Sequence, residues 1–281
     1  MVEMWCEYFY KKLYDKYGNA IHINLIERNK NITLDFVNKT KNIIKWNYNE
    51  LCLNPNITFD IVKLYNDIDW NYRYLSYNEN ITYDIIQNNN DKPWCIELCN
   101  YQYYEKWNIL HKLNNLDFYQ VSINPNIDIN IIKKYPKYKW NFKQFSKNSN
   151  VNMNVVIENI DFNWSYQELS YNKNITWDDV CNNINKNWSY IGLSKNPNIN
   201  MEIILNNLDK KWDFNYLSMN SNITLNIIEK YPMFKWSLKH YCKNINLTFE
   251  ELERIPLNNQ DLSSICLNEF IIDKNKYINN N

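Results

Sequence analysis

Tryptophan recurs at a fixed distance through most of the chain. It occupies positions 46, 70, 94, 140, 164, 188, 212 and 236. Successive positions differ by 24 residues, except that Trp94 and Trp140 are 46 residues apart. A period of this length marks tandem structural repeats, each of which buries its apolar side chains against its neighbours. The sequence therefore predicts a repeat array.

Two rows of asparagine share this period. In the repeat Trp164–Asn187, WSYQELSYNKNITWDDVCNNINKN, they are Asn172 and Asn174. Because both rows are in phase with apolar residues, they indicate an ordered structural role rather than a low-complexity tract. Asn carries donors and an acceptor, so we expect both rows to satisfy backbone groups at a turn and between neighbouring repeats. A Ser row, with Cys52, Cys242 and Cys266 in three repeats, predicts close approach of helices.

The residues after the asparagines form a helix-start signature. Thr, Asp or Asn stands where an N-cap would accept a backbone N–H, as at Thr58, Asp128 and Thr176. Apolar residues precede the cap and follow it four positions later, which is the pattern of a hydrophobic staple. The β-branched runs favour strands, but strict alternation is absent. The repeated cap and staple therefore predict helices.

These patterns predict an all-α fold: an α-solenoid of about ten two-helix repeats of about 24 residues. In each repeat a short helix would fit Trp-x-aromatic-x-x-Leu-Ser, and a second helix of about nine residues would follow the cap. We expect residues 1–20 to form an N-terminal capping helix and residues 21–272 the array, with an irregular repeat over 94–115. The polar residues 273–281 are expected to fray.

Composition excludes several function classes. The chain has 31 basic and 31 acidic residues, so net charge gives no argument for nucleic-acid or membrane binding. Only 2 glycines occur, so a phosphate-binding glycine loop cannot be written and nucleotide-dependent enzymes are disfavoured. No apolar run could cross a bilayer and no signal peptide is visible. We therefore expect a cytoplasmic protein.

Cysteine and histidine offer no convincing reaction centre. The 7 cysteines favour free thiols in a reducing compartment. Cys95 and Cys99, with His111, could face a metal, but no second Cys pair exists and buried structural thiols are favoured. His240 and Cys242 lack the third group of a nucleophilic pair. We predict no catalytic residue, no metal, no cofactor and no enzyme activity.

The positions that vary between repeats predict the partner surface. They are the third and fourth residues after Trp, and the residue before the first Asn. Stacked along a repeat array, such positions form the extended surfaces with which repeat proteins bind partners; the alternative is that they are unconstrained solvent positions. The candidates are Arg73, Tyr74, Lys143, Gln144, Gln167, Asn215, Tyr216 and Lys239.

Two features raise the possibility of nucleic-acid binding. The stretch Lys133–Lys147, KKYPKYKWNFKQFSK, is the most basic and aromatic part of the chain and could contact phosphates. Its lysines could equally complement a helix C-terminus. The Trp row could stack bases, but its phase with Leu and Ile, and Leu116 in one Trp position, favour a core role.

The repeated phrases LCLNPNIT at Leu51–Thr58 and LSKNPNIN at Leu193–Asn200 carry a resemblance. Over residues 21–272 the chain resembles tandem-repeat proteins of giant DNA viruses of the mimivirus type. The resemblance implies no enzyme activity and no cofactor, and it assigns no functional residue. It implies a viral protein of the infected cytoplasm.

Two function hypotheses follow. The first is a non-enzymatic scaffold that binds another protein, a host or viral factor, through the extended array surface. The second is a repeat protein that binds single-stranded nucleic acid through Lys133–Lys147. No membrane partner is expected.

Overall fold

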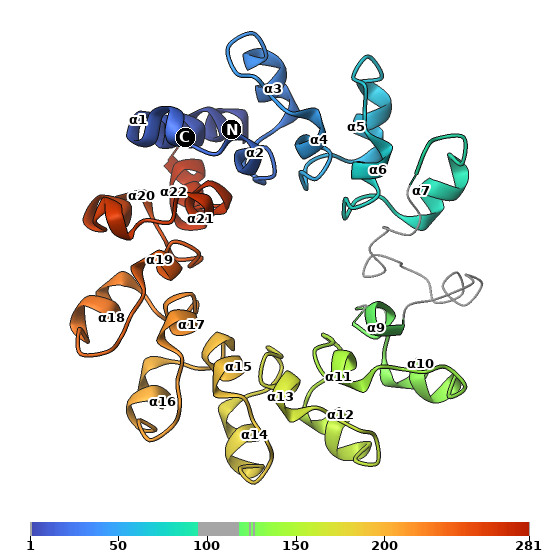
Figure 1. The fold of residues 1–281 in the computed structure, drawn as a ribbon, viewed down its shortest axis with the longest axis vertical. Coiled ribbons are helices and arrows are strands. Elements are labelled where there is room, and N and C mark those ends of the chain that lie inside the picture. Colours follow the sequence, from blue (N-terminus) through green and yellow to red (C-terminus); the bar gives the residue numbers. More distant parts are fainter. Residues whose placement is uncertain (1, 95–117, 124, 126, 281) are drawn as a thin grey trace. The chain divides into compact units, whose positions relative to one another are not determined.

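The structure is a computed structural model that describes residues 2–94, 118–123, 125 and 127–280. Over these residues it contains helices and no strand, so the predicted all-α class is confirmed (Figure 1). The irregular repeat expected over 94–115 lies, after Trp94, outside the described residues, as do Cys95, Cys99, His111 and Leu116.

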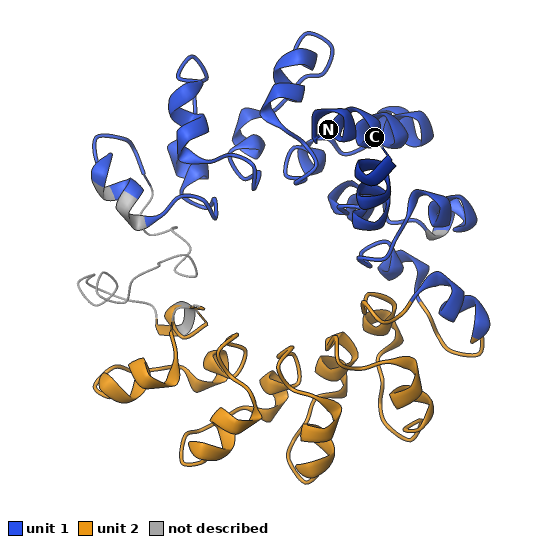
Figure 2. Cartoon of the chain, turned by 180° about the vertical axis from the view of Figure 1, so that it is seen from behind, with its two compact units in different colours: residues 1–99, 224–230, 237–281 blue, residues 100–223, 231–236 orange. Residues whose placement is uncertain are grey.

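The chain divides into two compact units (Figure 2). Unit 1 comprises residues 1–99, 224–230 and 237–281, and unit 2 comprises residues 100–223 and 231–236. In each unit the helices alternate between two rows, one formed by the first helices of the repeats and the other by the second helices (Figure 1).

The first helix of a repeat follows the Trp position, which Ile21, Leu116 and Gln260 occupy in three repeats, and is one to two turns long. These helices are α2 (Ile23–Ile26), α4 (Tyr48–Leu51), α6 (Tyr72–Leu75), α9 (Phe118–Val121), α11 (Phe142–Phe145), α13 (Tyr166–Leu169), α15 (Tyr190–Lys195), α17 (Phe214–Ser218), α19 (Leu238–Tyr241) and α21 (Leu262–Leu267). The seven that follow a Trp begin two residues after it, not at Trp as predicted, because the Asn, Ser or Asp after Trp forms the N-cap. Ser165, for example, accepts the N–H of Glu168 at 3.3 Å.

The second helix follows the Asn-x-Asn corner and is shorter than the nine residues predicted. These helices are α3 (Leu34–Thr40), α5 (Phe59–Leu64), α7 (Tyr83–Asn88), α10 (Ile129–Lys134), α12 (Met153–Glu158), α14 (Trp177–Asn182), α16 (Met201–Leu205), α18 (Leu225–Lys230) and α20 (Phe249–Arg254). Their predicted caps are present. Thr176 forms a full capping box with Asp179, and Asp128 accepts the N–H of Ile131 at 2.9 Å. Within the described ranges, the remaining elements are the terminal helices and the 3-10 turns Gly18–Ala20 and Leu257–Asn259.

The Trp row lies in the core, as predicted, and also terminates the second helix. Trp164 and Trp188 are 9% and 8% exposed, whereas Trp140 and Trp236 are half-buried. The indole Nε1 of Trp188 donates to the carbonyl of Asn183 at 2.9 Å, and Trp164 does the same to Asn159 at 2.8 Å. Each indole thereby satisfies a carbonyl that the end of a helix leaves unpaired.

The first Asn of the corner connects each repeat to the preceding one. Asn196 is fully buried, and its Nδ2 donates to the carbonyls of Asn172 at 2.9 Å and Ile175 at 3.1 Å. Its Oδ1 accepts the N–H of Asn198 at 2.9 Å, and the Nδ2 of Asn198 in turn donates to the carbonyls of Lys173 and Ile175. The same set recurs at Asn54 and Asn56 in unit 1. The two Asn rows thus form a ladder of hydrogen bonds from Asn side chains to the backbone of the preceding repeat.

The Ser row provides a third link. Ser170 Oγ donates to the carbonyl of Tyr166 at 2.8 Å and accepts the N–H of Ser189, the N-cap residue of the next first helix, at 2.9 Å. Cys242 Sγ takes the same role toward Asp261 at 3.4 Å. The row is therefore a hydrogen-bond relay as well as a site of close approach.

Within unit 1 the first repeat stacks on the last repeat. Asn29 Nδ2 donates to the carbonyls of Cys266 at 2.8 Å and Asn268 at 3.0 Å, and Asn31 Nδ2 donates to that of Glu269 at 2.8 Å. This is the pattern of the internal repeats, formed between residues more than 230 positions apart. In unit 1 the first and last repeats thus cover each other's edges.

Two terminal helices pack together over this joint. Helix α1 (Val2–Tyr17) buries Trp5, Phe9 and Leu13. The expected fraying of residues 273–281 is wrong for residues 273–280, because α22 (Ile271–Asn280) runs through them and packs on α1. The Tyr277 ring lies 5.5 Å from that of Trp5. The polar tail sequence was misleading because its helix is stabilised by partners at the opposite end of the chain.

Candidate functional site

The eight predicted partner residues all lie on first helices. Arg73 and Tyr74 on α6 and Lys239 on α19 belong to unit 1, and the other five, on α11, α13 and α17, belong to unit 2. Unit 2 therefore brings together Lys143, Gln144, Gln167, Asn215 and Tyr216 on one row of first helices.

One of these residues was wrongly predicted to be exposed. Gln144 is only 4% exposed, so it cannot contribute to a contact surface. The third residue after Trp points to solvent, as at Lys143, Gln167 and Asn215, whereas the fourth is rotated by about 100° and meets the neighbouring helix. Tyr74 and Tyr216, also fourth residues, are half-buried for the same reason.

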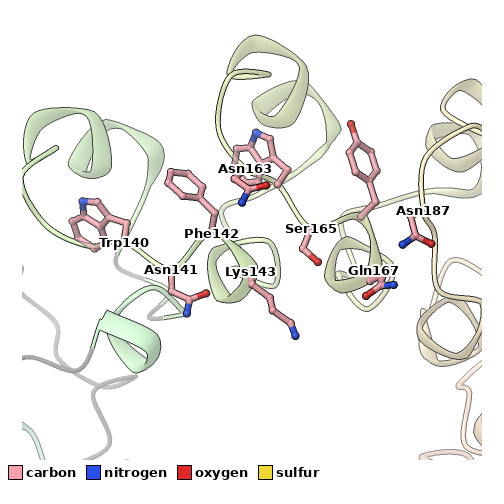
Figure 3. Close-up of a pocket in the computed structure, with 10 residues that line it drawn as sticks. Trp140, Asn141, Phe142, Lys143, Asn163, Ser165, Gln167 and Asn187 are labelled. Atoms are coloured by element: carbon pink, nitrogen blue, oxygen red, sulfur yellow. The ribbon is translucent and has the colours of Figure 1, made fainter.

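A groove of about 600 Å³ lies beside the exposed residues of α11 and α13 (Figure 3). Two successive repeats, residues 140–163 and 164–187, line it, and the wall includes Lys143 and Gln167. Tyr166 is also in the wall, and burial raises the pKa of its phenol. Its hydroxyl is buried and has no hydrogen-bond partner among the described residues. The groove is polar, so it suits a peptide backbone or polar side chains more than an apolar ligand.

A connected set of charges and rings extends from this groove along the first helices. Glu168 on α13 pairs with Lys147 at 2.8 Å and with Lys143 at 3.6 Å. The Nζ of Lys147 lies 5.9 Å from the ring centroid of Tyr171. Lys195 lies 5.5 Å from the same ring and 3.9 Å from that of Tyr216. These residues occupy four successive first helices or their ends.

One glycine allows this arrangement. Gly192 on α15 is buried, and a Cβ placed there would lie 2.7 Å from Ser170 Cβ and 2.9 Å from the ring of Tyr171. Other repeats carry Glu, Gln, Tyr or His at this position, as at Glu168 and His240. The absence of a side chain lets the Tyr171 ring lie against the backbone of α15.

The lysines of the stretch Lys133–Lys147 do not share one location. Lys133 and Lys134 end the second helix α10, whereas Lys143 lies on the first helix α11. Lys134 and Lys137 each lie over a neighbouring tyrosine, at 5.6 Å and 5.3 Å from the ring centroids of Tyr135 and Tyr138. The stretch is thus split between the two rows.

The remaining candidate groups have structural roles. Cys6 and Cys52 are buried, and burial raises their thiol pKa values to about 12 and about 11, which keeps them protonated and unreactive. His240 Nδ1 is 2.7 Å from Ser237 Oγ at a helix start. In the part of the chain that the structure describes, no three His, Cys, Asp or Glu side chains gather to hold a metal ion. None of the helices within the described ranges is long and apolar enough to span a bilayer.

The chain matches no family model, no curated protein and no solved structure with which it was compared. Its own residues are therefore the basis for a functional proposal.

Proposed function

We propose that this chain is a non-enzymatic repeat scaffold that binds another protein through the exposed side of its first helices. One observation carries the proposal: the third residue after Trp is exposed in each of seven described repeats, and five different residue types occupy this position. The set is Asn49, Arg73, Lys143, Gln167, Ile191, Asn215 and Lys239. A regular framework that presents a different side chain at each step is how repeat arrays recognise partners.

The buried residues of the repeats support the proposal, because they have structural roles and leave binding to the exposed positions. Trp188, Asn196 and Ser194 are buried and hydrogen-bonded between or within repeats. They fix the spacing of the exposed residues, so binding specificity would reside in the variable positions. The resemblance to giant-virus repeat proteins adds the expectation that the partner is a host or viral factor in the cytoplasm.

A pull-down with the full chain tests the proposal. Lys143→Glu reverses a charge on the first helix α11, and Lys133→Glu makes the same change on the second helix α10 as a matched control. We expect a protein that co-purifies with the wild-type chain to be lost with Lys143→Glu and kept with Lys133→Glu. Arg73→Glu is the corresponding test in unit 1. Retention by both first-helix variants would contradict the proposal.

Single-stranded RNA binding is the competing function. It predicts a salt-dependent affinity that falls when Lys133, Lys134, Lys137 and Lys139 are changed to Gln. We expect no such binding, because Lys133 and Lys134 lie on the second helix α10 and Lys134 and Lys137 already contact tyrosine rings. If RNA affinity depended steeply on salt and these four substitutions abolished that dependence, single-stranded RNA binding would replace the scaffold proposal.

A further inference from the structure

The first-helix row of unit 2 carries a cluster of lysines held against tyrosine rings. The cluster, called here the Lys–Tyr cluster, consists of Lys143, Lys147, Glu168, Tyr171, Lys195 and Tyr216. It has three cations and one carboxylate, so its charge is positive although the whole chain is neutral. We propose that the Lys–Tyr cluster binds an extended acidic segment of the partner protein; this rests on the proposed function and specifies the chemistry of the partner.

The cations are positioned before a ligand arrives. Lys195 lies 3.9 Å from the Tyr216 ring centroid and 5.5 Å from that of Tyr171, so its ammonium group is held between two rings. Gly192 provides the space in which the Tyr171 ring rests. A lysine held in this way loses less side-chain entropy when it binds an anion, and cation–π contact leaves N–H donors free for a carboxylate.

Glu168 is the one carboxylate of the Lys–Tyr cluster, and an acidic ligand would compete with it for Lys143 and Lys147. Glu168 has a side chain only 13% exposed and forms ion pairs with Lys147 and Lys143, whose side chains are 33% and 64% exposed. The ammonium groups of these pairs remain partly exposed to water, which weakens the ion pairs. An incoming acidic side chain can therefore engage the exposed donors of Lys143 and Lys147 without first breaking a strong contact.

The length of the cluster sets the length of the segment. It extends over four first helices, α11 to α17, and neighbouring helices pack about 8–10 Å apart. Three such steps cover about 25–30 Å, which an extended chain at about 3.3 Å per residue spans with about eight residues. The site therefore fits an acidic octapeptide.

The same geometry disfavours a nucleic-acid strand. Single-stranded nucleic acids bind by stacking bases on exposed aromatic faces. Here Lys147 and Lys195 both lie over Tyr171, and Lys195 also covers Tyr216. Because lysine side chains already lie over these tyrosine rings, little of the ring faces is free to stack with a base.

Fluorescence polarisation with the full chain at low salt tests the inference. The probes are a labelled octapeptide of alternating Glu and Ala, the same peptide with Gln for Glu, and an octauridine RNA. We expect the acidic peptide alone to bind. Lys195→Gln should weaken it by about fivefold, and Glu168→Gln should tighten it by about threefold because the competing carboxylate is removed. A gain of affinity cannot result from misfolding.

Lys186→Gln is the matched control. Lys186 also lies over a tyrosine, 5.2 Å from the Tyr166 ring centroid, but outside the Lys–Tyr cluster. Its substitution should leave the affinity unchanged. Equal losses in Lys195→Gln and Lys186→Gln, no gain in Glu168→Gln, or tighter binding of octauridine would each overturn the inference. A partner that is lost with Lys143→Glu while the acidic peptide fails to bind would leave the scaffold function standing with a different ligand chemistry.

Discussion

Substitution of a single ladder asparagine, Asn196→Ala, should destabilise the chain far more than a typical polar substitution. The side chain is fully buried, makes good hydrogen bonds to the carbonyls of Asn172 and Ile175, and accepts the N–H of Asn198. Each neutral hydrogen bond contributes about 1 kcal/mol, and an N–H left without its acceptor costs at least as much. We expect a loss of about 3 kcal/mol.

Asn198→Ala is the matched control. Asn198 lies two residues away and also donates to two carbonyls, those of Lys173 at 2.7 Å and Ile175 at 2.9 Å, but it is exposed. Water can replace its contacts, so we expect a loss of only about 1 kcal/mol. The difference of about 2 kcal/mol corresponds to a factor of about 30 in the unfolding constant.

Urea unfolding followed by far-ultraviolet circular dichroism measures both variants against the wild-type chain. If the dependence of the unfolding free energy on urea is unchanged, the shift in midpoint gives the loss in stability. A loss below about 1 kcal/mol for Asn196→Ala, or equal losses in both variants, would refute the assignment of the first Asn row to the buried ladder.

Three further substitutions test other parts of the framework. Trp188→Ala should cost about 3–5 kcal/mol by melting, whereas Trp188→Phe, which keeps a ring and loses the bond to Asn183, should cost much less; equal costs would contradict the packing role. Asn29→Ala should speed proteolysis of α1 and α22 through loss of the end joint, and unchanged proteolysis would contradict that joint. Burial raises the pKa of Glu27 to about 7, so this carboxyl loses its proton at lower pH in the unfolded chain than in the folded chain. Stability should therefore fall as pH rises from about 4.5 to 7, and Glu27→Gln should abolish up to about 3 kcal/mol of that fall. A pH profile of stability identical to that of the wild-type chain would contradict this role of Glu27.

The sequence predicted those features whose cause is local. A cap and its staple lie within about five residues of each other, so Thr176 and Asp128 could be recognised as helix starts from the chain alone. The period of Trp and Asn then placed both residue types in the interior. The N-caps after Trp were recognisable in principle, because Ser165, Ser189 and Asp213 are all capping residue types.

The features that the sequence missed depend on distant partners. Helix α22 is stabilised by α1, which is more than 250 residues away in the chain, so its polar composition looked like a frayed end. Gln144 was wrongly predicted to be exposed, because it lies only one residue, or about 100° of helix rotation, from the exposed Lys143 and therefore faces the neighbouring helix. The Lys–Tyr cluster depends on Gly192 and Tyr171 meeting between repeats, which a residue pattern does not specify.

Site-specific photo-crosslinking can show whether the first helices form the partner surface. A photoreactive residue would replace Gln167 or Asn215 on the first helices, or Asp178 or Glu202 on the second helices, all four of which are exposed positions of unit 2. We expect one protein of the cell extract to crosslink from positions 167 and 215 and not from positions 178 and 202. The opposite pattern, or equal crosslinking from all four positions, would contradict it.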